Sequence, residues 1–192
     1  MTRKLYYEDC HLTSFSACVT GCEKTDKGWE VTLDATAFYP EGGGQACDLG
    51  TLNGIAVTDV RERGEEIIHL CEAALEVGAA AEGVIDYERR FDLMQQHTGE
   101  HIVSGIINRR YGYHNVGFHM GSEMTEIDFD GVIPPEDLAA IEQEANAALW
   151  QNLAVKCRYP SQEELPNVFY RTKRALPWPV RSRQYSEETS TL

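Results

Sequence analysis

Two histidines one helical turn apart are the residues of this sequence best suited to chemistry. His97 and His101 enclose the segment His-Thr-Gly-Glu-His. Residues at positions i and i+4 of a helix lie on one face, so two imidazoles at this spacing can share one metal ion, usually zinc. In the metalloprotease pattern a glutamate directly follows the first histidine, whereas Glu100 precedes the second one here. A surface or half-buried histidine pair explains the spacing equally well, so both interpretations stay open.

A glycine-rich run is the second candidate site. Residues 38–45 read Phe-Tyr-Pro-Glu-Gly-Gly-Gly-Gln, with consecutive glycines at Gly42, Gly43 and Gly44 followed by Gln45. Glycine permits positive φ and close approach of a ligand to the backbone, so exposed amides here could bind a phosphate or the sugar of an RNA end. The run matches neither a Walker loop nor a GxGxxG turn. A wide loop between strands is the alternative.

Two further groups of residues are candidates for substrate binding. His119 lies on a predicted strand and faces either a cleft or solvent. Tyr170 and Trp178 lie among basic residues that include Arg171 and Arg174. A mixture of basic and aromatic side chains suits the stacking of a terminal base of RNA. Packing of the same aromatic side chains in a core is an equal alternative.

The order and spacing of these motifs resemble the alanyl-tRNA editing family, the free-standing relatives of the editing domain of alanyl-tRNA synthetase. The resemblance extends from Asp34 to about Pro179. It rests on three segments, which read DATAFYPEGGGQACDLG, DYERRFDLMQQHTGEHIVSG and VGFHMGSEMTEIDFDG. The first of these, from Asp34 to Gly50, is highly specific.

The resemblance implies hydrolysis of alanine tRNA that is mischarged with serine or glycine. In that family a β-barrel carries the glycine motif and an α+β domain holds zinc, for which His97 and His101 would be two ligands and catalytic groups. Gln45, the third catalytic residue, would lie toward the terminal ribose or the amino acid. The residues that the resemblance assigns to substrate binding are Gly42, Gly43, Gly44, His119, Arg171 and Arg174.

One motif of the family is missing. The family completes its zinc site with a downstream C-x-x-x-H motif, but no cysteine follows Cys157 and no histidine follows His119. The expectation is therefore a chain that is truncated or frameshifted before that motif. Two functions stay open: a metal-dependent aminoacyl-tRNA deacylase, and a module that binds tRNA or a synthetase without catalysis. An unrelated metallohydrolase ranks last, because it leaves the glycine motif unexplained.

The first part of the chain has the pattern of short strands. Residues 1–70 contain runs rich in Val, Ile, Thr and aromatic residues. Turn signals separate these runs at Asp26-Lys27-Gly28, Asn53-Gly54 and Arg63-Gly64. Several short strands at this spacing predict a small barrel or a sandwich.

The second part has helical periodicity as well as strands. Apolar residues near 3.6 spacing predict a helix from residue 86 through 108, and residues 116–130 read as two strands. A second helix is expected to begin at residues 134–137, and a strand at 153–159. Residues 161–164, Ser-Gln-Glu-Glu, have the pattern of a capping box.

The prediction is an α+β protein with two domains. A small N-terminal β-barrel that carries the glycine motif is expected at residues 1–85. An editing-type domain with two main helices on an antiparallel sheet, incomplete at its C-terminus, is expected at residues 86–192. The small-residue segment 72–83 is read as a short linking strand or loop near the boundary.

Charge and hydropathy limit the function classes. The 192 residues carry a formal net charge of −14, and residues 1–88 hold 6 basic against 17 acidic side chains. So acidic a chain is a poor general binder of polyanions, although a local basic face could still seat an RNA end. Without a secretory signal or an apolar run of about 20 residues, we expect a cytoplasmic protein with reduced thiols, no membrane partner and an oligomeric state that the sequence leaves open.

Overall fold

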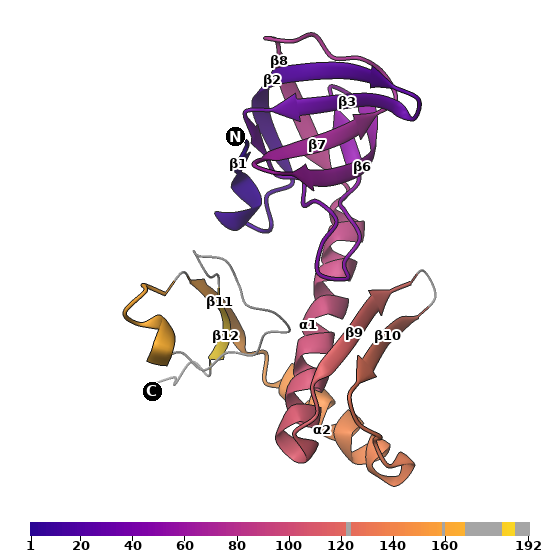
Figure 1. Ribbon diagram of the computed structural model, residues 1–192, viewed down its shortest axis with the longest axis vertical. Helices are drawn as coiled ribbons and strands as arrows, with labels where there is room; N and C mark the ends of the chain where they lie inside the picture. Colours follow the sequence, from indigo (N-terminus) through magenta and orange to yellow (C-terminus); the bar gives the residue numbers. More distant parts are fainter. Residues whose placement is uncertain (122–123, 159, 168–181, 187–192) are drawn as a thin grey trace. The chain divides into compact units, whose positions relative to one another are not determined.

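The computed structural model describes residues 1–192 except 122–123, 159, 168–181 and 187–192 (Figure 1). The chain divides into two compact units. The first contains Met1–Thr98 and Phe118–Glu126, and the second contains Gly99–Gly117 and Ile127–Leu192. The domain boundary expected after residue 85 remains a prediction.

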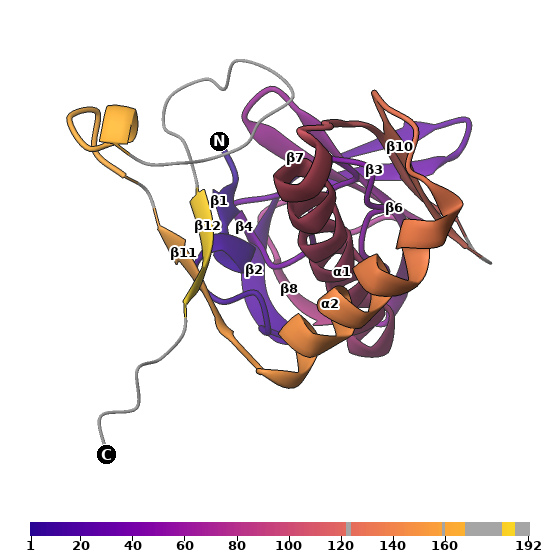
Figure 2. The ribbon, with the colours of Figure 1, turned by 90° about the horizontal axis from the view of Figure 1, so that it is seen from below.

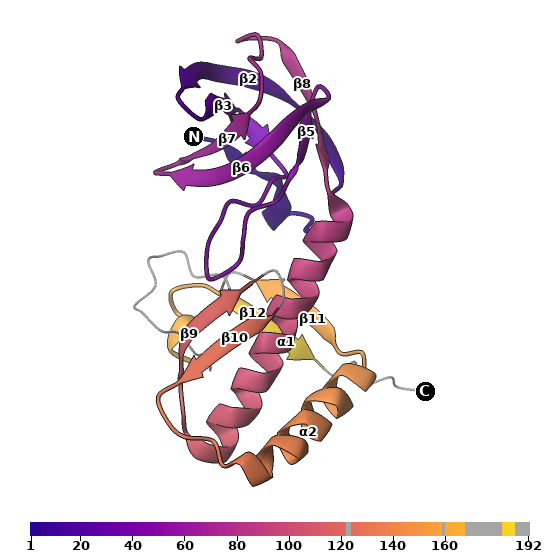
Figure 3. The ribbon, with the colours of Figure 1, turned by 90° about the vertical axis from the view of Figure 1, so that its right-hand side faces the viewer.

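The first unit is built from strands and the first half of a long helix. Its strands and its 3₁₀ helix η1 are β1 (Arg3–Lys4), η1 (Leu5–Tyr7), β2 (Ser14–Thr25), β3 (Gly28–Leu33), β4 (Ala35–Thr36), β5 (Gly50–Leu52), β6 (Ile55–Arg63), β7 (Glu66–Cys71) and β8 (Ala80–Ile85). Six of them close into a barrel in the order β2-β3-β7-β6-β5-β8, in the region where the sequence predicts a barrel or a sandwich (Figures 1 and 3). All neighbouring strands of this barrel are antiparallel. Strand β1 pairs with β4 in parallel (Figure 2).

The three predicted hairpin turns are confirmed. Residues 26–27 join β2 to β3. Asn53 and Gly54 join β5 to β6 with φ of 51° and 78°, the left-handed values of a type I′ turn. Gly64, with φ of 63°, stands between β6 and β7. Strand β8 lies partly within the segment expected as a linking strand or loop, and its residues alternate between exposed and buried.

The barrel core is mainly apolar, and it includes a buried histidine with polar contacts. Alternate residues of β2 point inward, as the period of a strand requires. The fully or almost fully buried members include Val19, Val31, Leu33, Phe38, Leu52, Val57, Val60 and Ile67. His69 is buried beside them, with Nε2 at 2.8 Å from Thr36 Oγ1 and Nδ1 at 3.1 Å from the Val31 carbonyl oxygen. Burial lowers the pKa of His69 to about 4, so this histidine is neutral at pH 7.

The second unit combines helices with strand pairs. Helix α1 (Tyr87–Tyr111) begins in the first unit and ends in the second. It is followed by β9 (Asn115–Met120), β10 (Thr125–Phe129), η2 (Pro135–Asp137), α2 (Leu138–Trp150), β11 (Ala154–Arg158), η3 (Leu165–Asn167) and β12 (Ser182–Ser186). Of these, β9 and β10 each have residues in both units. The α+β class is confirmed. The strands described after α1 form two separate pairs, β9 with β10 and β11 with β12, rather than one continuous sheet beneath the helices.

Side-chain packing joins the helices of the second unit. Ile106 and Ile107 of α1 form a core with Ile141 of α2. Figure 3 shows the second half of α1 and α2 side by side. The predicted capping box is confirmed: the Ser161 amide donates to Glu164 Oε2 at 2.8 Å, and the Glu164 amide donates to Ser161 Oγ at 3.2 Å. Among the described residues, no helix is long and apolar enough to cross a membrane.

Candidate functional site

The tip of the glycine motif is a tight hairpin turn. Gly42 and Gln45 exchange two backbone hydrogen bonds, of 3.1 Å and 3.0 Å. Gly43 and Gly44 between them have φ of 62° and 83°, a left-handed pair that favours glycine. The amides of Gly42 and Gln45 are therefore engaged in this turn, which lies within the long loop between β4 and β5. The substrate role of the glycines remains a prediction.

A buried ion pair holds the base of the same loop. Asp48 and Arg90 are 1% and 0% exposed, and their side chains lie 2.5 Å apart at the shortest N–O distance. The Tyr39 amide also donates to Asp48 Oδ2 at 2.5 Å, and Arg90 donates to the Ala37 carbonyl oxygen at 2.5 Å. A buried charge is tolerated when it is both paired and hydrogen-bonded. This pair fixes the first turn of α1 against the loop.

Most of the specific motif from Asp34 to Gly50 is scaffold in this structure. Asp34 Oδ1 accepts a hydrogen bond from the Cys18 amide at 2.7 Å. Thr36 Oγ1 accepts one from the Phe38 amide at 3.1 Å, and the Phe38 ring is completely buried in the barrel. Gln45 differs from these residues, because its side chain reaches a histidine of helix α1.

Gln45 orients His97. Gln45 Oε1 lies 2.7 Å from His97 Nδ1. Gln45 belongs to the loop between β4 and β5, which runs beside the first half of α1 (Figure 1). A carbonyl oxygen only accepts, so Nδ1 carries the hydrogen and the lone pair of the neutral ring is on Nε2. The Phe118 ring lies 5.3 Å from the His97 ring between centroids. Phe118 also lies close to the backbone of Gly44, where a Cβ would be only 2.6 Å from the Phe118 carbonyl oxygen.

Glu100 is the centre of a buried polar network. Its Oε1 accepts hydrogen bonds from Ser104 Oγ, at 2.5 Å, and from Asn115 Nδ2. Its Oε2 lies 2.9 Å from His101 Nδ1. Burial by itself would raise the pKa of Glu100, but the hydrogen bonds from His101, Ser104 and Asn115 outweigh it and bring that pKa to about 2. Glu100 is therefore an anion at neutral pH.

One turn of α1 presents donor atoms that suit a metal ion. Ligand atoms of His97, Glu100 and His101 all lie within 4.8 Å of one another. Neutral imidazole nitrogen and carboxylate oxygen are both ligands that zinc accepts. In each histidine the Nδ1 atom meets an oxygen acceptor, an amide for His97 and a carboxylate for His101, as is usual for histidines that bind a metal. The residues fit a zinc ion by these criteria.

The other predicted site residues lie apart from this turn or outside the described residues. His119 is exposed on β9. Successive residues of a strand point to opposite faces, so His119 points away from the face on which its neighbour Phe118 meets His97. Its substrate role stays a prediction. Arg171 and Arg174, with Tyr170 and Trp178, lie in the segment 168–181, outside the described residues.

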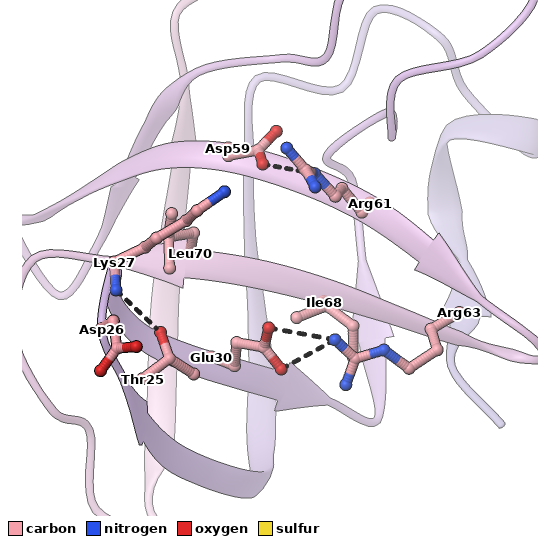
Figure 4. Close-up of a pocket in the computed structure, with 9 residues that line it drawn as sticks. All are labelled: Thr25, Asp26, Lys27, Glu30, Asp59, Arg61, Arg63, Ile68 and Leu70. Carbon is pink, nitrogen blue, oxygen red and sulfur yellow. Dashed lines mark hydrogen bonds and ion pairs between the residues drawn. The ribbon is translucent and has the colours of Figure 1, made fainter.

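A surface groove on the barrel does not coincide with any of these residues. It has a volume of about 310 Å³ and lies over β3, β6 and β7 (Figure 4). Its two arginines are paired, Arg61 with Asp59 at 2.6 Å and Arg63 with Glu30 at 2.9 Å. Since these cations are already neutralised, the groove has no excess charge that would select a ligand.

Comparison with known proteins finds relatives of this chain. The family described as "tRNA synthetases class II (A)" matches residues 2–89. The chain is 33% identical over 187 residues to the alanyl-tRNA editing protein Aarsd1 of Mus musculus, which covers 90% of the chain and 45% of that relative. It is 33% identical over 162 residues to the alanyl-tRNA editing protein AlaX-L of Pyrococcus horikoshii, covering 81% and 40% respectively. The chain is thus similar to alanyl-tRNA editing proteins over most of its own length.

The similarity also extends to longer proteins of the synthetase class. The chain is 38% identical over 175 residues to the alanine–tRNA ligase of Natronomonas pharaonis, covering 85% of the chain and 19% of that enzyme. The chain spans somewhat less than half the length of the editing proteins that it matches. Two residues that shape the site, Arg90 and Asn115, did not emerge from the sequence analysis of the motifs. Neither has a local signal, because each acts on a partner distant along the chain.

Proposed function

We propose that this chain hydrolyses the ester of alanine tRNA mischarged with serine or glycine, using a zinc ion held by His97 and His101. One observation carries the proposal. The side chain of Gln45, from the glycine motif, meets the first histidine of the HxxxH pair at 2.7 Å. The two motifs that carry the family resemblance thus contribute to one constellation of side chains. Similarity to alanyl-tRNA editing proteins supports the same substrate class.

The histidines are proposed to bind zinc through Nε2. Gln45 accepts from Nδ1 of His97, and Glu100 faces Nδ1 of His101, so each ring has its lone pair on Nε2 when it is neutral. A zinc ion bound there would supply Lewis acidity toward the ester carbonyl of the substrate. Gln45 holds the His97 ring in one orientation, and Phe118 packs against that ring.

The substrate's terminal adenosine is proposed to lie near the glycine turn. Gly42, Gly43 and Gly44 are exposed, and open space of at least 4 Å surrounds the position of a Cβ on Gly42 and on Gly43. An exposed, narrow turn lets a ribose approach the backbone closely. His119, Arg171 and Arg174 are proposed to contact the tRNA beyond the ester.

The decisive experiment compares two histidine variants. Purified wild-type chain, His97→Ala and His114→Ala are assayed for hydrolysis of Ser-tRNA and Gly-tRNA made with alanine tRNA, and the zinc content of each sample is measured. His114 is a matched control, because it is exposed and pairs with Asp130 at 3.3 Å outside the site. We expect His97→Ala to lose zinc and hydrolysis, and His114→Ala to keep both.

Three other results would contradict parts of the proposal. Unchanged turnover in His97→Ala would remove the metal assignment. Binding of alanine tRNA without hydrolysis by the wild-type chain would favour a module that recognises tRNA and does not catalyse. Hydrolysis of correctly charged Ala-tRNA at the same rate as Ser-tRNA would argue against an editing role.

A further inference from the structure

The two oxygens of the Glu100 carboxylate have different partners. Its Oε1 accepts from Ser104 and Asn115, and its Oε2 faces His101 Nδ1 at 2.9 Å. The Glu100 side chain is 4% exposed, whereas the His101 side chain is 39% exposed. The donors on Oε1 come from the next turn of α1 and from the first residue of β9. The carboxylate is therefore held from one side and holds the histidine on the other.

This division argues against Glu100 as a metal ligand. A carboxylate has about four lone-pair positions, and three are already used by these donors. Direct coordination through Oε1 would leave the buried donors of Ser104 and Asn115 without an acceptor, which is unfavourable. Oε2 keeps one lone-pair position, but the oxygen is already held 2.9 Å from His101 Nδ1. Both oxygens are better explained as fixed acceptors.

We propose that Glu100 is a positioning residue that keeps the His101 ring in the Nδ1–H form, with Nε2 directed to the metal. A carboxylate accepts and does not donate, so it selects the tautomer in which Nδ1 carries the hydrogen. Gln45 does the same for His97 from a different part of the chain. The role of His101 Nε2 as a ligand rests on the proposed zinc site, but the tautomer itself does not.

The first measurement needs no metal. The full chain is labelled with ¹⁵N-histidine, freed of metal with a chelator and studied at pH 8.5, where ordinary histidines are neutral. Long-range ¹H–¹⁵N spectra then identify the protonated nitrogen of each ring. We expect the Nδ1–H form for His101 in the wild type and a shift toward Nε2–H in Glu100→Ala. Glu100→Gln is included because it preserves shape, and its single acceptor cannot serve both His101 and Asn115.

The second measurement is zinc affinity, by competition with a chromophoric chelator. Loss of a residue that orients a ligand weakens metal binding by about 10–100-fold, and we expect this for both Glu100 variants. Asp130→Asn is the matched control, because it removes the carboxylate beside His114 at 3.3 Å and not the one beside His101. That variant should change the His114 signals and leave zinc affinity as it is.

The outcomes separate this inference from the proposed function. A wild-type His101 in the Nε2–H form, or a tautomer that is the same in every folded Glu100 variant, would overturn the positioning role. Loss of zinc in Glu100→Ala as complete as in His101→Ala, with an unchanged tautomer, would make Glu100 a ligand instead. If the wild-type chain takes up no zinc, the proposed metal site fails, and the tautomer still decides whether Glu100 positions His101.

Discussion

Replacement of Arg90 by methionine tests whether the buried ion pair holds the glycine loop to helix α1. The guanidinium of Arg90 donates to Asp48, to the Ala37 carbonyl oxygen at 2.5 Å and to the Leu12 carbonyl oxygen at 3.4 Å. Methionine keeps much of the apolar stem and removes every donor. The Asp48 carboxylate, 1% exposed, would then be buried without a countercharge. Breaking a buried pair in this way costs about 3–5 kcal/mol of unfolding free energy.

The assay is urea denaturation followed by circular dichroism. Because a small protein loses about 1–3 kcal/mol of unfolding free energy per molar urea, the midpoint of Arg90→Met should fall by at least about 1 M. Arg90→Lys should be intermediate, since it restores a charge without the planar fork of donors.

The exposed pair of Arg3 and Glu8 provides the control. These side chains are 66% and 54% exposed and lie 2.8 Å apart. Arg3→Met should therefore change the unfolding free energy very little, as is usual for exposed ion pairs. An unfolding free energy for Arg90→Met indistinguishable from that for Arg3→Met would refute the reasoning. It would mean that the Asp48 carboxylate finds solvent or another donor when Arg90 is removed.

Two further predictions concern the barrel and the glycine turn. The pKa of His69 is lowered to about 4 in the folded chain, against about 6.5 in the unfolded chain. Only the unfolded chain takes up the proton between these values, so the unfolding free energy should fall by about 3 kcal/mol as pH drops from 7 to 4. Urea titrations at several pH values should show a shallower fall for His69→Gln, and parallel curves would contradict this. Gly43→Val should cost about 1–2 kcal/mol because its φ is 62°, whereas Gly43→Asn should cost little. Equal thermal midpoints for the two Gly43 variants would show that the turn relaxes.

The local structure of this chain could be predicted because short segments determine it. Asn53-Gly54 forms the expected left-handed turn, since these two residue types tolerate positive φ better than others. Ser161 and Glu164 form the expected reciprocal cap, which involves residues three positions apart. The spacing of His97 and His101 on one helical face follows from the helical period alone. The order of the motifs along the chain was sufficient to indicate the family.

The partners of the site residues depended on the tertiary structure. Gln45 meets His97 across 52 positions, and Asp48 meets Arg90 across 42. The closing of the barrel and the packing of α1 bring these pairs together. The sequence indicated a glycine loop with free amides, but the structure has a hairpin whose turn uses two of them. A hydrophobic pattern identifies strands and faces, but it does not specify which distant polar groups become neighbours.

Glu100 shows, within one five-residue segment, both what the sequence predicts and what depends on the tertiary structure. Its place in the His-Thr-Gly-Glu-His segment was evident from the sequence, and so was its difference from the metalloprotease pattern. Its hydrogen bond from Asn115 became evident only after β9 was seen to return beside α1. The helical spacing and the turns could be predicted from the sequence, because they depend on the conformational preferences of a few adjacent residues. The tertiary structure decided which acceptor faces each imidazole, because that depends on how the whole chain packs.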